Sequence, residues 1–252
     1  MKDSISFPKG IFFDMDGVLL LTTQRSAQSW QLVGHHFAPL LGLSPWRLTQ
    51  ALAESRQAYA QEIAHDAHKQ QRDRLEPFAT RREMVERALA QVGKRERALA
   101  SAMVRSYERL RKTHRRLAPF AHETLQALRD RGLRLALLSN GNARYQRQKI
   151  AHHRLAPLFD AIWIEEEVGI AKPDPRIFLM AMERFALSAH EVWMVGDDLA
   201  RDIAASQHLG LFAIWCDSLR RGVPDGQVAH PDRIIHTLPE ILLLLQEALP
   251  FH

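Results

Sequence analysis

Cysteine is almost absent from this sequence of 252 residues, which contains only Cys216. A single cysteine excludes a disulfide within the chain, and it leaves no set of thiolates that could hold a structural zinc ion. The 13 histidines include three pairs close in sequence: His35 and His36, His65 and His68, and His152 and His153. None of these pairs follows a predicted strand together with other ligands, so we expect solvent-exposed histidines rather than a zinc site.

Long apolar runs are also missing. No stretch reaches about 18 consecutive apolar residues, the length that a membrane-spanning helix requires. The opening residues, MKDSISFPKG, contain no apolar stretch of the kind that precedes the cleavage site of a signal peptide. We therefore expect a cytoplasmic protein without a membrane partner. The hydrophobic content of 46% is still sufficient for one substantial core and a smaller accessory domain.

Acidic residues are scarce in only one part of the chain. Residues 21–118 contain 18 Lys and Arg but 9 Asp and Glu, a net charge of +9, whereas the other residues have a net charge of −4. The excess positive charge therefore belongs to one segment. A basic helical segment is most often a solvated face; otherwise it steers an anionic substrate or binds a polyanion. We expect no nucleic-acid partner, and the sequence indicates no particular oligomeric state.

Short apolar runs outside that segment predict buried parallel strands. They end near Gly, Asp or Ser, and they lie at 10–14, 133–139, 161–165, 192–196 and 211–215. Amphipathic stretches between them predict helices at 122–132 and 174–187. Strands that alternate with helices of this length are typical of a doubly wound parallel sheet. The sequence thus predicts an α/β fold, in which Cys216 lies at the end of a buried strand.

Residues 22–117 interrupt this alternation and predict an all-helical insert. They contain no convincing strand, and helices are expected near 24–41, 45–70, 80–92 and 95–113. Because the insert directly follows the first strand, we expect an α/β core of residues 1–21 and 118–252 and a helical cap of residues 22–117. The aromatic residues expected in the core of the cap are Trp30, Phe37, Trp46 and Tyr59.

Two carboxylates, Asp14 and Asp16, follow the first predicted strand and precede Gly17. In a parallel α/β sheet, ligands bind in the crevice at the carboxyl ends of the strands. Two carboxylates one residue apart in a turn can both approach one centre there, and Gly17 permits a tight backbone. The alternative interpretation is an Asx turn that simply ends a strand.

Polar residues also follow the next predicted strands. Ser139, Asn140 and Gly141 precede a helical pattern, where a hydroxyl and backbone N–H groups would form a phosphate cradle. Lys172 lies in a loop before a helix that begins with proline, where its ammonium would neutralise phosphate charge. Alone, each of these signals is weak. A lysine in a loop, for example, is usually solvated.

A further group of carboxylates follows the strand that ends at Gly196. Asp197 and Asp198 come directly after this strand, and Asp202 lies one helical turn later. Carboxylate oxygens suit a hard cation such as Mg²⁺. Polar motifs at the carboxyl ends of so many predicted strands are difficult to explain by packing alone, and together they indicate one reactive crevice.

As a set, these motifs resemble those of the haloacid dehalogenase-like hydrolase superfamily. DMDGVL, SNG, GIAKPDPRIF and GDDLARD occur in the order typical of the family, with a helical cap between the first and the second. The resemblance covers nearly the whole chain. It implies a Rossmann-like core and a magnesium-dependent phosphatase that hydrolyses a small phosphomonoester through an aspartyl-phosphate intermediate.

The resemblance also implies roles for the matching residues. Asp14 would be the nucleophile, Asp16 the general acid and base, and Lys172 the lysine that neutralises charge. The expected substrate-binding residues are Ser139, Asn140 and Gly141.

The expected metal site consists of the Asp14 side chain, the Asp16 backbone carbonyl and Asp197, which would hold Mg²⁺. Asp202 would orient Lys172 or a metal-bound water, and the role of Asp198 is open. The sequence departs from the family pattern at Leu21, where the family often has an acidic residue.

Several alternatives remain open at this stage. A haloacid dehalogenase would use the same nucleophile and lysine, although the resembling dehalogenases have a non-acidic residue at the position of Asp16. A phosphomutase would use the same residues, and a catalytically silent binding module would keep the fold. The substrate is expected to be a small phosphorylated metabolite; phosphoglycolate, a sugar phosphate and a nucleoside monophosphate all stay open.

Overall fold

The computed structural model describes residues 6–224, 226 and 229–248. The chain divides into two compact units. The core unit comprises Met1–Leu21 and Leu117–His252, and the helical unit comprises Thr22–Arg116. No helix in the described parts of the chain has both the length and the apolar composition needed to cross a membrane.

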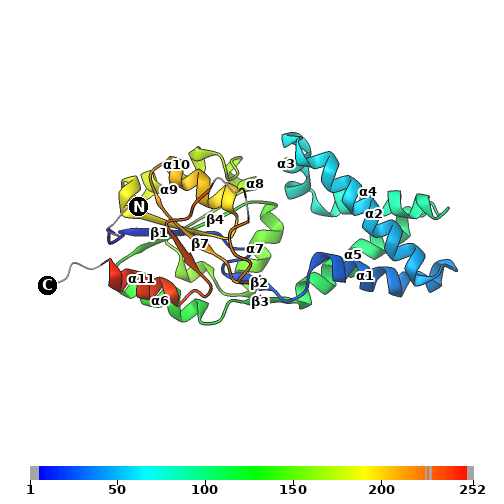
Figure 1. The fold of residues 1–252 in the computed structure, drawn as a ribbon, viewed down its shortest axis with the longest axis horizontal. Helices are drawn as coiled ribbons and strands as arrows, with labels where there is room; N and C mark the ends of the chain where they lie inside the picture. Colours follow the sequence, from blue (N-terminus) through cyan, green and yellow to red (C-terminus); the bar gives the residue numbers. More distant parts are fainter. Residues whose placement is uncertain (1–5, 225, 227–228, 249–252) are drawn as a thin grey trace. The chain divides into compact units, whose positions relative to one another are not determined.

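A parallel sheet of six strands forms the centre of the core unit (Figure 1). In spatial order, the strands are β5 (Ala161–Ile164), β4 (Arg134–Ser139), β1 (Gly10–Phe13), β6 (Val192–Gly196), β7 (Phe212–Cys216) and β8 (Arg233–Ile235). The predicted α/β fold is therefore confirmed, and buried Cys216 ends β7. The strand β8 was not predicted, because three residues are too few to give a clear apolar run.

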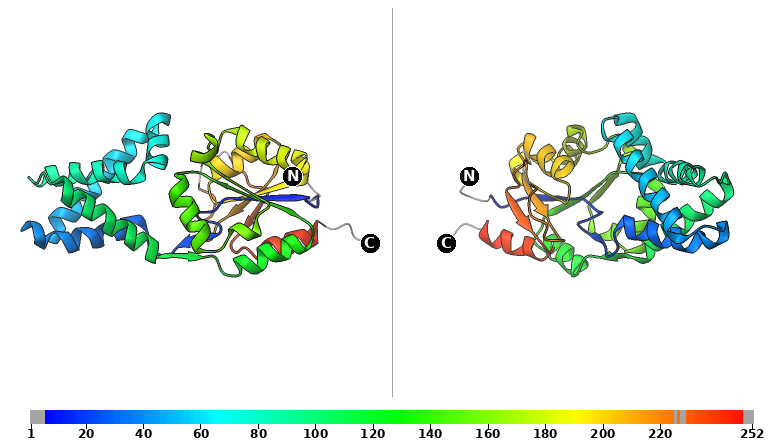
Figure 2. Two further views of the ribbon diagram at one scale, coloured as in Figure 1. Left: turned by 180° about the vertical axis from the view of Figure 1, so that it is seen from behind. Right: turned by 45° about the vertical axis from the view of Figure 1, so that its right-hand side comes forward.

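Helices cover both faces of this sheet, as Figures 1 and 2 show. Ile11 and Phe13 of β1 pack in a cluster with α6 (Ala121–Asp130), α7 (Ala143–His152) and α11 (Glu240–Glu247). Phe12 packs on the other face with α9 (Pro175–Phe185) and α10 (Ala205–His208). Alternate side chains of a strand point to opposite faces, so β1 is apolar on both sides and is buried in the middle of the sheet.

Short elements complete the core unit. The helix α8 is Glu165–Val168, and a π-helical segment, η4, is Leu199–Ala204. The 3-10 turns of this unit are η2 (Ala156–Leu158) and η3 (Ala189–Glu191).

The helical unit contains α1 (Ser26–Phe37), the 3-10 turn η1 (Pro39–Leu41), α2 (Pro45–Ala64), α3 (Ala67–Leu75), α4 (Pro77–Gln91) and α5 (Arg97–Thr113). Its apolar cluster draws residues from α1, α2, α4 and α5. Trp30 and Phe37 are buried there as expected, and the Trp30 ring stacks on Tyr107. The prediction for Trp46 was wrong, because its side chain is 71% exposed. The helix expected at 45–70 is two helices, because the Asp66 side chain accepts a hydrogen bond from Lys69 and caps α3.

A two-stranded sheet of β2 (Leu20–Thr22) and β3 (Arg115–Leu117) joins the two ends of the insert. The expectation that residues 22–117 contain no strand was therefore wrong at both ends. Thr23 N–H donates to the His114 carbonyl at 3.0 Å, which continues the pairing at the start of the helical unit. Each strand has three residues, and their partners lie far apart in sequence, so local apolar periodicity cannot reveal the pairing.

Part of the positive charge of the helical unit is balanced within that unit. Among its ion pairs are those that join Arg81 to Glu108, Arg82 to Glu86 and Arg87 to Glu62. Exposed pairs of this kind contribute about 0–1 kcal/mol each to stability. These arginines therefore favour the interpretation of the basic segment as a solvated face.

Candidate active site

The site is built where β1, β4 and β6 end side by side. Asp14 follows β1, Ser139 is the last residue of β4, and Asp197 follows β6. Because β1 lies between the other strands, these residues come from adjacent strand ends. One carboxylate oxygen from each of Asp14, Asp197 and Asp202 lies within 4.8 Å of the others. The structure thus brings together three of the carboxylates that the sequence predicts for one crevice.

Lys172 lies buried among these carboxylates, with 2% of its side chain exposed. Its Nζ donates to Asp14 Oδ1 at 2.6 Å and lies 2.7 Å from Asp202 Oδ1. Burial alone would lower the pKa of Lys172, but the charges of Asp14 and Asp202 outweigh it and raise the pKa above its usual value. Lys172 is therefore a charged ammonium placed directly against the predicted nucleophile.

The backbone of Lys172 is held by Asn140. Asn140 Nδ2 donates to the Lys172 carbonyl at 2.7 Å, and Lys172 N–H donates to Asn140 Oδ1 at 2.9 Å. The Asn140 side chain therefore positions the lysine, whereas the sequence predicts a phosphate ligand at this residue.

The carboxylates outnumber the cation that contacts them. Burial raises the pKa of Asp14 to about 6 against the opposing charge of Lys172, and Asp202 adds to the rise. Burial, followed by the charges of Asp14 and Asp202, also raises the pKa of Asp197. Such shifts mean that the site holds more negative charge than its surroundings stabilise. A hard divalent cation such as Mg²⁺ fits this all-oxygen donor set and would balance its charge.

Asp202 connects Lys172 to the backbone after β6. Its Oδ2 accepts a hydrogen bond from Asp198 N–H at 3.1 Å, and its Oδ1 faces Lys172. Asp202 therefore contacts Lys172, and its orienting role stays a prediction. The Asp198 side chain caps η4 instead, because it accepts from Ala200 N–H at 3.0 Å and pairs with Arg201 at 2.6 Å. Burial would raise the pKa of Asp198, but the hydrogen bonds from Arg201 hold it below its usual value.

The turn after β4 differs from the predicted phosphate cradle. Gly141 N–H donates to Glu165 Oε2 at 2.8 Å, and Ala143 N–H donates to Glu166 Oε2 at 2.7 Å. Both acceptors belong to α8. These amides are therefore engaged by carboxylates, and a phosphate group at Gly141 would have to compete with buried Glu165.

Two side chains of α7 reach the site and were not predicted from the sequence. Lys149 Nζ lies 2.5 Å from Asp16 Oδ2. Gln146 Nε2 donates to Ser139 Oγ at 2.8 Å and to Asp16 Oδ2 at 3.3 Å. The available signal was their spacing of three residues, which places both on one face of a helix.

The sequence model of the haloacid dehalogenase-like hydrolase family matches residues 8–210 of this chain. The chain belongs to this hydrolase family. The match begins before β1 and includes every predicted site residue from Asp14 to Asp202, which confirms the resemblance found in the motifs.

Curated relatives of this hydrolase include phosphatases. The phosphoserine phosphatase of Thermus thermophilus is 39% identical over 66% of this chain and 65% of its own length. The glyceraldehyde 3-phosphate phosphatase of Pyrococcus abyssi is 34% identical over 46% of this chain and 48% of its own length. The matched parts thus span about half to two thirds of these relatives.

Solved structures match the hydrolase along most of its length. The HAD-hydrolase YfnB of Bacillus subtilis bound to magnesium has a TM-score of 0.67 and 21% identity, over 94% of this chain and 98% of that one. This likeness shows a shared fold. The 2-haloacid dehalogenase of Pseudomonas syringae pv. Tomato has a TM-score of 0.63 and 26% identity, over 95% and 98% of the two chains.

Two glycines allow the carboxylates of the hydrolase to pack directly against backbone. Gly17 has a φ of 94°, and a Cβ there would lie 2.0 Å from Asp197 Oδ2. A Cβ on Gly196 would lie 2.2 Å from the Cβ of Asp202. Any larger residue at either position would displace a carboxylate of the site.

Gly196→Ala is expected to lower both activity and stability, because the new methyl group must push Asp202 away from Lys172. Overpacking of this kind destabilises proteins by about 1–3 kcal/mol, and we expect kcat to fall at least about tenfold. Urea unfolding and steady-state kinetics measure the two effects. Gly42→Ala is the control, since it strains a left-handed residue with open space around it and should leave kcat unchanged. Wild-type kcat in Gly196→Ala would contradict the steric argument.

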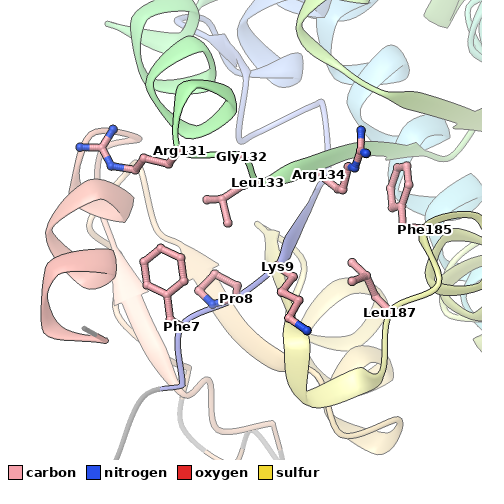
Figure 3. A pocket seen from close by; sticks show the side chains of 9 residues that line it. All are labelled: Phe7, Pro8, Lys9, Arg131, Gly132, Leu133, Arg134, Phe185 and Leu187. Atoms are coloured by element: carbon pink, nitrogen blue, oxygen red, sulfur yellow. The ribbon is translucent and has the colours of Figure 1, made fainter. Parts of the chain in front are cut away.

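A separate pocket lies at the other end of the sheet, before β1 and β4 begin (Figure 3). Its volume is about 330 Å³, and it is lined by Phe7, Pro8, Lys9, Arg131, Gly132, Leu133, Arg134, Phe185 and Leu187. It contains none of the predicted site residues. Lys9 of this pocket pairs with Glu191 at 2.5 Å, so part of its positive charge is already neutralised.

Proposed function

We propose that this hydrolase is a magnesium-dependent phosphatase that hydrolyses a small phosphomonoester through an aspartyl-phosphate on Asp14. The observation that supports it most directly is the contact of 2.6 Å between Asp14 and the buried ammonium of Lys172. A carboxylate attacks an anionic phosphoryl group poorly, because like charges repel. A fixed cation beside the nucleophile offsets that repulsion without reorganisation during the reaction.

In the first proposed step, an Asp14 oxygen forms a bond to phosphorus while the ester P–O bond breaks. Asp16 gives its proton to the leaving alcohol. In the second step, Asp16 takes a proton from water, whose oxygen bonds to phosphorus as the bond to Asp14 breaks, and inorganic phosphate leaves. Positioned acid–base catalysis of this kind contributes about 10²–10⁴-fold.

The remaining residues hold charge and position in this proposal. The Asp14 and Asp197 side chains and the Asp16 carbonyl would hold Mg²⁺, which supplies positive charge against the phosphoryl oxygens when it is bound. Ser139 would bind a phosphoryl oxygen through its hydroxyl, which Gln146 orients from 2.8 Å. Asn140 contributes by fixing Lys172.

The proposal predicts that phosphatase activity requires Mg²⁺. Phosphate release is measured with p-nitrophenyl phosphate and with a panel of esters that includes phosphoserine, glyceraldehyde 3-phosphate, phosphoglycolate and nucleoside monophosphates. Excess EDTA should abolish activity, and added Mg²⁺ should restore it. Ca²⁺ should replace Mg²⁺ poorly, because its larger and looser coordination shell misplaces the reacting groups. Full activity in EDTA would contradict the proposed metal site.

A haloacid dehalogenase is the second candidate function, favoured by the 26% identity with the Pseudomonas syringae enzyme and by the Asp14–Lys172 contact that both reactions would use. The acidic residue at Asp16 favours the phosphatase. Chloride release from a 2-haloacid, independent of added metal, would support the dehalogenase instead. The cytoplasmic location stays a prediction, and the sequence predicts neither the physiological ester nor the partition between phosphatase and phosphomutase.

A further inference from the structure

Asp16 is held by two side chains from a different part of the chain. It lies in the turn after β1, and its side chain is 47% exposed. Its Oδ2 lies 2.5 Å from Lys149 Nζ and 3.3 Å from Gln146 Nε2, both on α7. A half-exposed carboxylate in a turn has freedom to rotate, and these donors restrict it.

The helix α7 is itself tied to the site. The Asn142 side chain caps its first turn, and Ile150 on its buried face packs in the apolar cluster of the sheet. Only 14% of the Lys149 side chain is exposed, whereas a lysine usually keeps its charged ammonium group in water. The Lys149–Asp16 contact thus joins a mostly buried ammonium on a packed helix to a half-exposed carboxylate, whereas both partners of an ordinary surface pair are exposed.

Gln146 couples Asp16 to the neighbouring strand end. It is 5% exposed, and its amide nitrogen also lies 2.8 Å from Ser139 Oγ and 2.6 Å from the Asn140 carbonyl oxygen, so its two hydrogens are shared among three acceptors. The same side chain therefore contacts the proposed proton carrier and the proposed phosphate-binding hydroxyl. This arrangement fixes one relative to the other.

We propose that Lys149 and Gln146 are positioning residues that orient the Asp16 carboxylate for proton transfer. The inference rests on the proposed function, because it assigns their effect to the acid–base role of Asp16. A proton carrier must lie within about 2.6–3.2 Å of its partner, so loss of orientation lowers the rate of proton transfer more than the affinity for substrate.

Lys149→Met removes the charged donor while keeping a side chain of similar length. We expect kcat to fall about 10- to 100-fold, less than the about 10²–10⁴-fold of a complete acid–base contribution because Asp16 itself remains, while KM changes less than about threefold. Lys149→Arg should restore part of kcat, because it returns a cationic donor. Gln146→Leu should lower kcat less, since Gln146 contacts Asp16 at the longer distance of 3.3 Å.

Arg147→Met is the matched control. It removes the same charge from the same helix, but Arg147 pairs with Glu167 at 2.6 Å, away from Asp16. It should keep wild-type kcat and KM. A loss in Arg147→Met equal to that in Lys149→Met would show a general effect of helix charge and would overturn the inference.

The decisive measurement repeats Lys149→Met in an Asp16→Asn background. The burst of p-nitrophenolate from p-nitrophenyl phosphate reports phosphoryl transfer to Asp14 even when later hydrolysis is slow. If Lys149 acts through Asp16, the second substitution should change the burst rate less than about twofold. The burst rate is also measured for Lys149→Met alone. If Lys149→Met lowers the burst rate by the same factor with and without Asp16→Asn, Lys149 acts elsewhere, for example directly on the substrate. Failure of the proposed function would look different, because wild-type protein would then show neither burst nor turnover.

Discussion

Asp14→Asn is expected to lose more than about 10³-fold in kcat, because an amide cannot form the acyl-phosphate and nucleophile removal has effects of this size or larger. The fold should survive, since Asn has the shape of Asp. The variant also removes one negative charge from a site where burial raises the pKa of Asp14 to about 6. Lys172 keeps its second contact, Asp202, at 2.7 Å.

Steady-state kinetics and thermal unfolding of one preparation test this expectation. Asp174→Asn serves as the control, because Asp174 also forms an ion pair at 2.6 Å, with Arg176, but lies outside the site. The control should retain wild-type kcat. Trapping with acid after mixing with labelled substrate should show phosphoenzyme in wild-type protein and none in Asp14→Asn. More than a few per cent of wild-type kcat in a clean preparation would contradict the nucleophile assignment.

The long buried elements could be predicted because their signals are local. The apolar run at 10–14 and the amphipathic stretch at 174–187 coincide closely with Gly10–Phe13 and Pro175–Phe185. The pairing of β2 with β3 was missed, because it depends on partners at opposite ends of the insert. The break between α2 and α3 has a local signal in Asp66, whose side chain caps α3, but the helical pattern of the sequence continues on both sides of this residue.

The site residues that could be predicted from the sequence also differ in position from those that could not. Asp14, Ser139 and Asp197 could be predicted because each lies at the end of a strand, where the topology of a parallel sheet brings them together. Residues that contact the site from helix faces could not be predicted from the sequence. The contact of Lys149 with Asp16 depends on how α7 rotates and packs against the sheet, and no local pattern contains that register.

The carboxylates that accept hydrogen bonds from the backbone N–H groups after β4 could not be predicted for a similar reason. An N–H group before a helix is a reasonable phosphate donor in isolation. Glu165 belongs to α8, and its carboxylate reaches Gly141 only through the tertiary arrangement of β4 and β5. The local sequence therefore indicates the backbone donors but not their acceptor.

Lys172→Met is expected to be the most disruptive single substitution for both stability and catalysis. It leaves the carboxylates of Asp14 and Asp202 in a site where they now contact Lys172 at 2.6 and 2.7 Å. Removing one partner of a buried ion pair destabilises proteins by about 3–5 kcal/mol, because the remaining charge is buried without compensation. Turnover should disappear, since the cation that offsets repulsion between Asp14 and phosphate is gone.

Urea unfolding separates this effect from a simple loss of surface charge. Lys9→Met is the matched control, because the Lys9 side chain is 69% exposed in its pair with Glu191 and should contribute less than about 1 kcal/mol. The double variant Lys172→Met/Asp202→Asn should recover part of the lost stability, because it removes one of the uncompensated charges, but it should stay inactive. A destabilisation of Lys172→Met no larger than that of Lys9→Met would mean that the ammonium does not compensate the buried carboxylates. Recovery of activity in the double variant would show that Asp14 does not need a neighbouring cation to react.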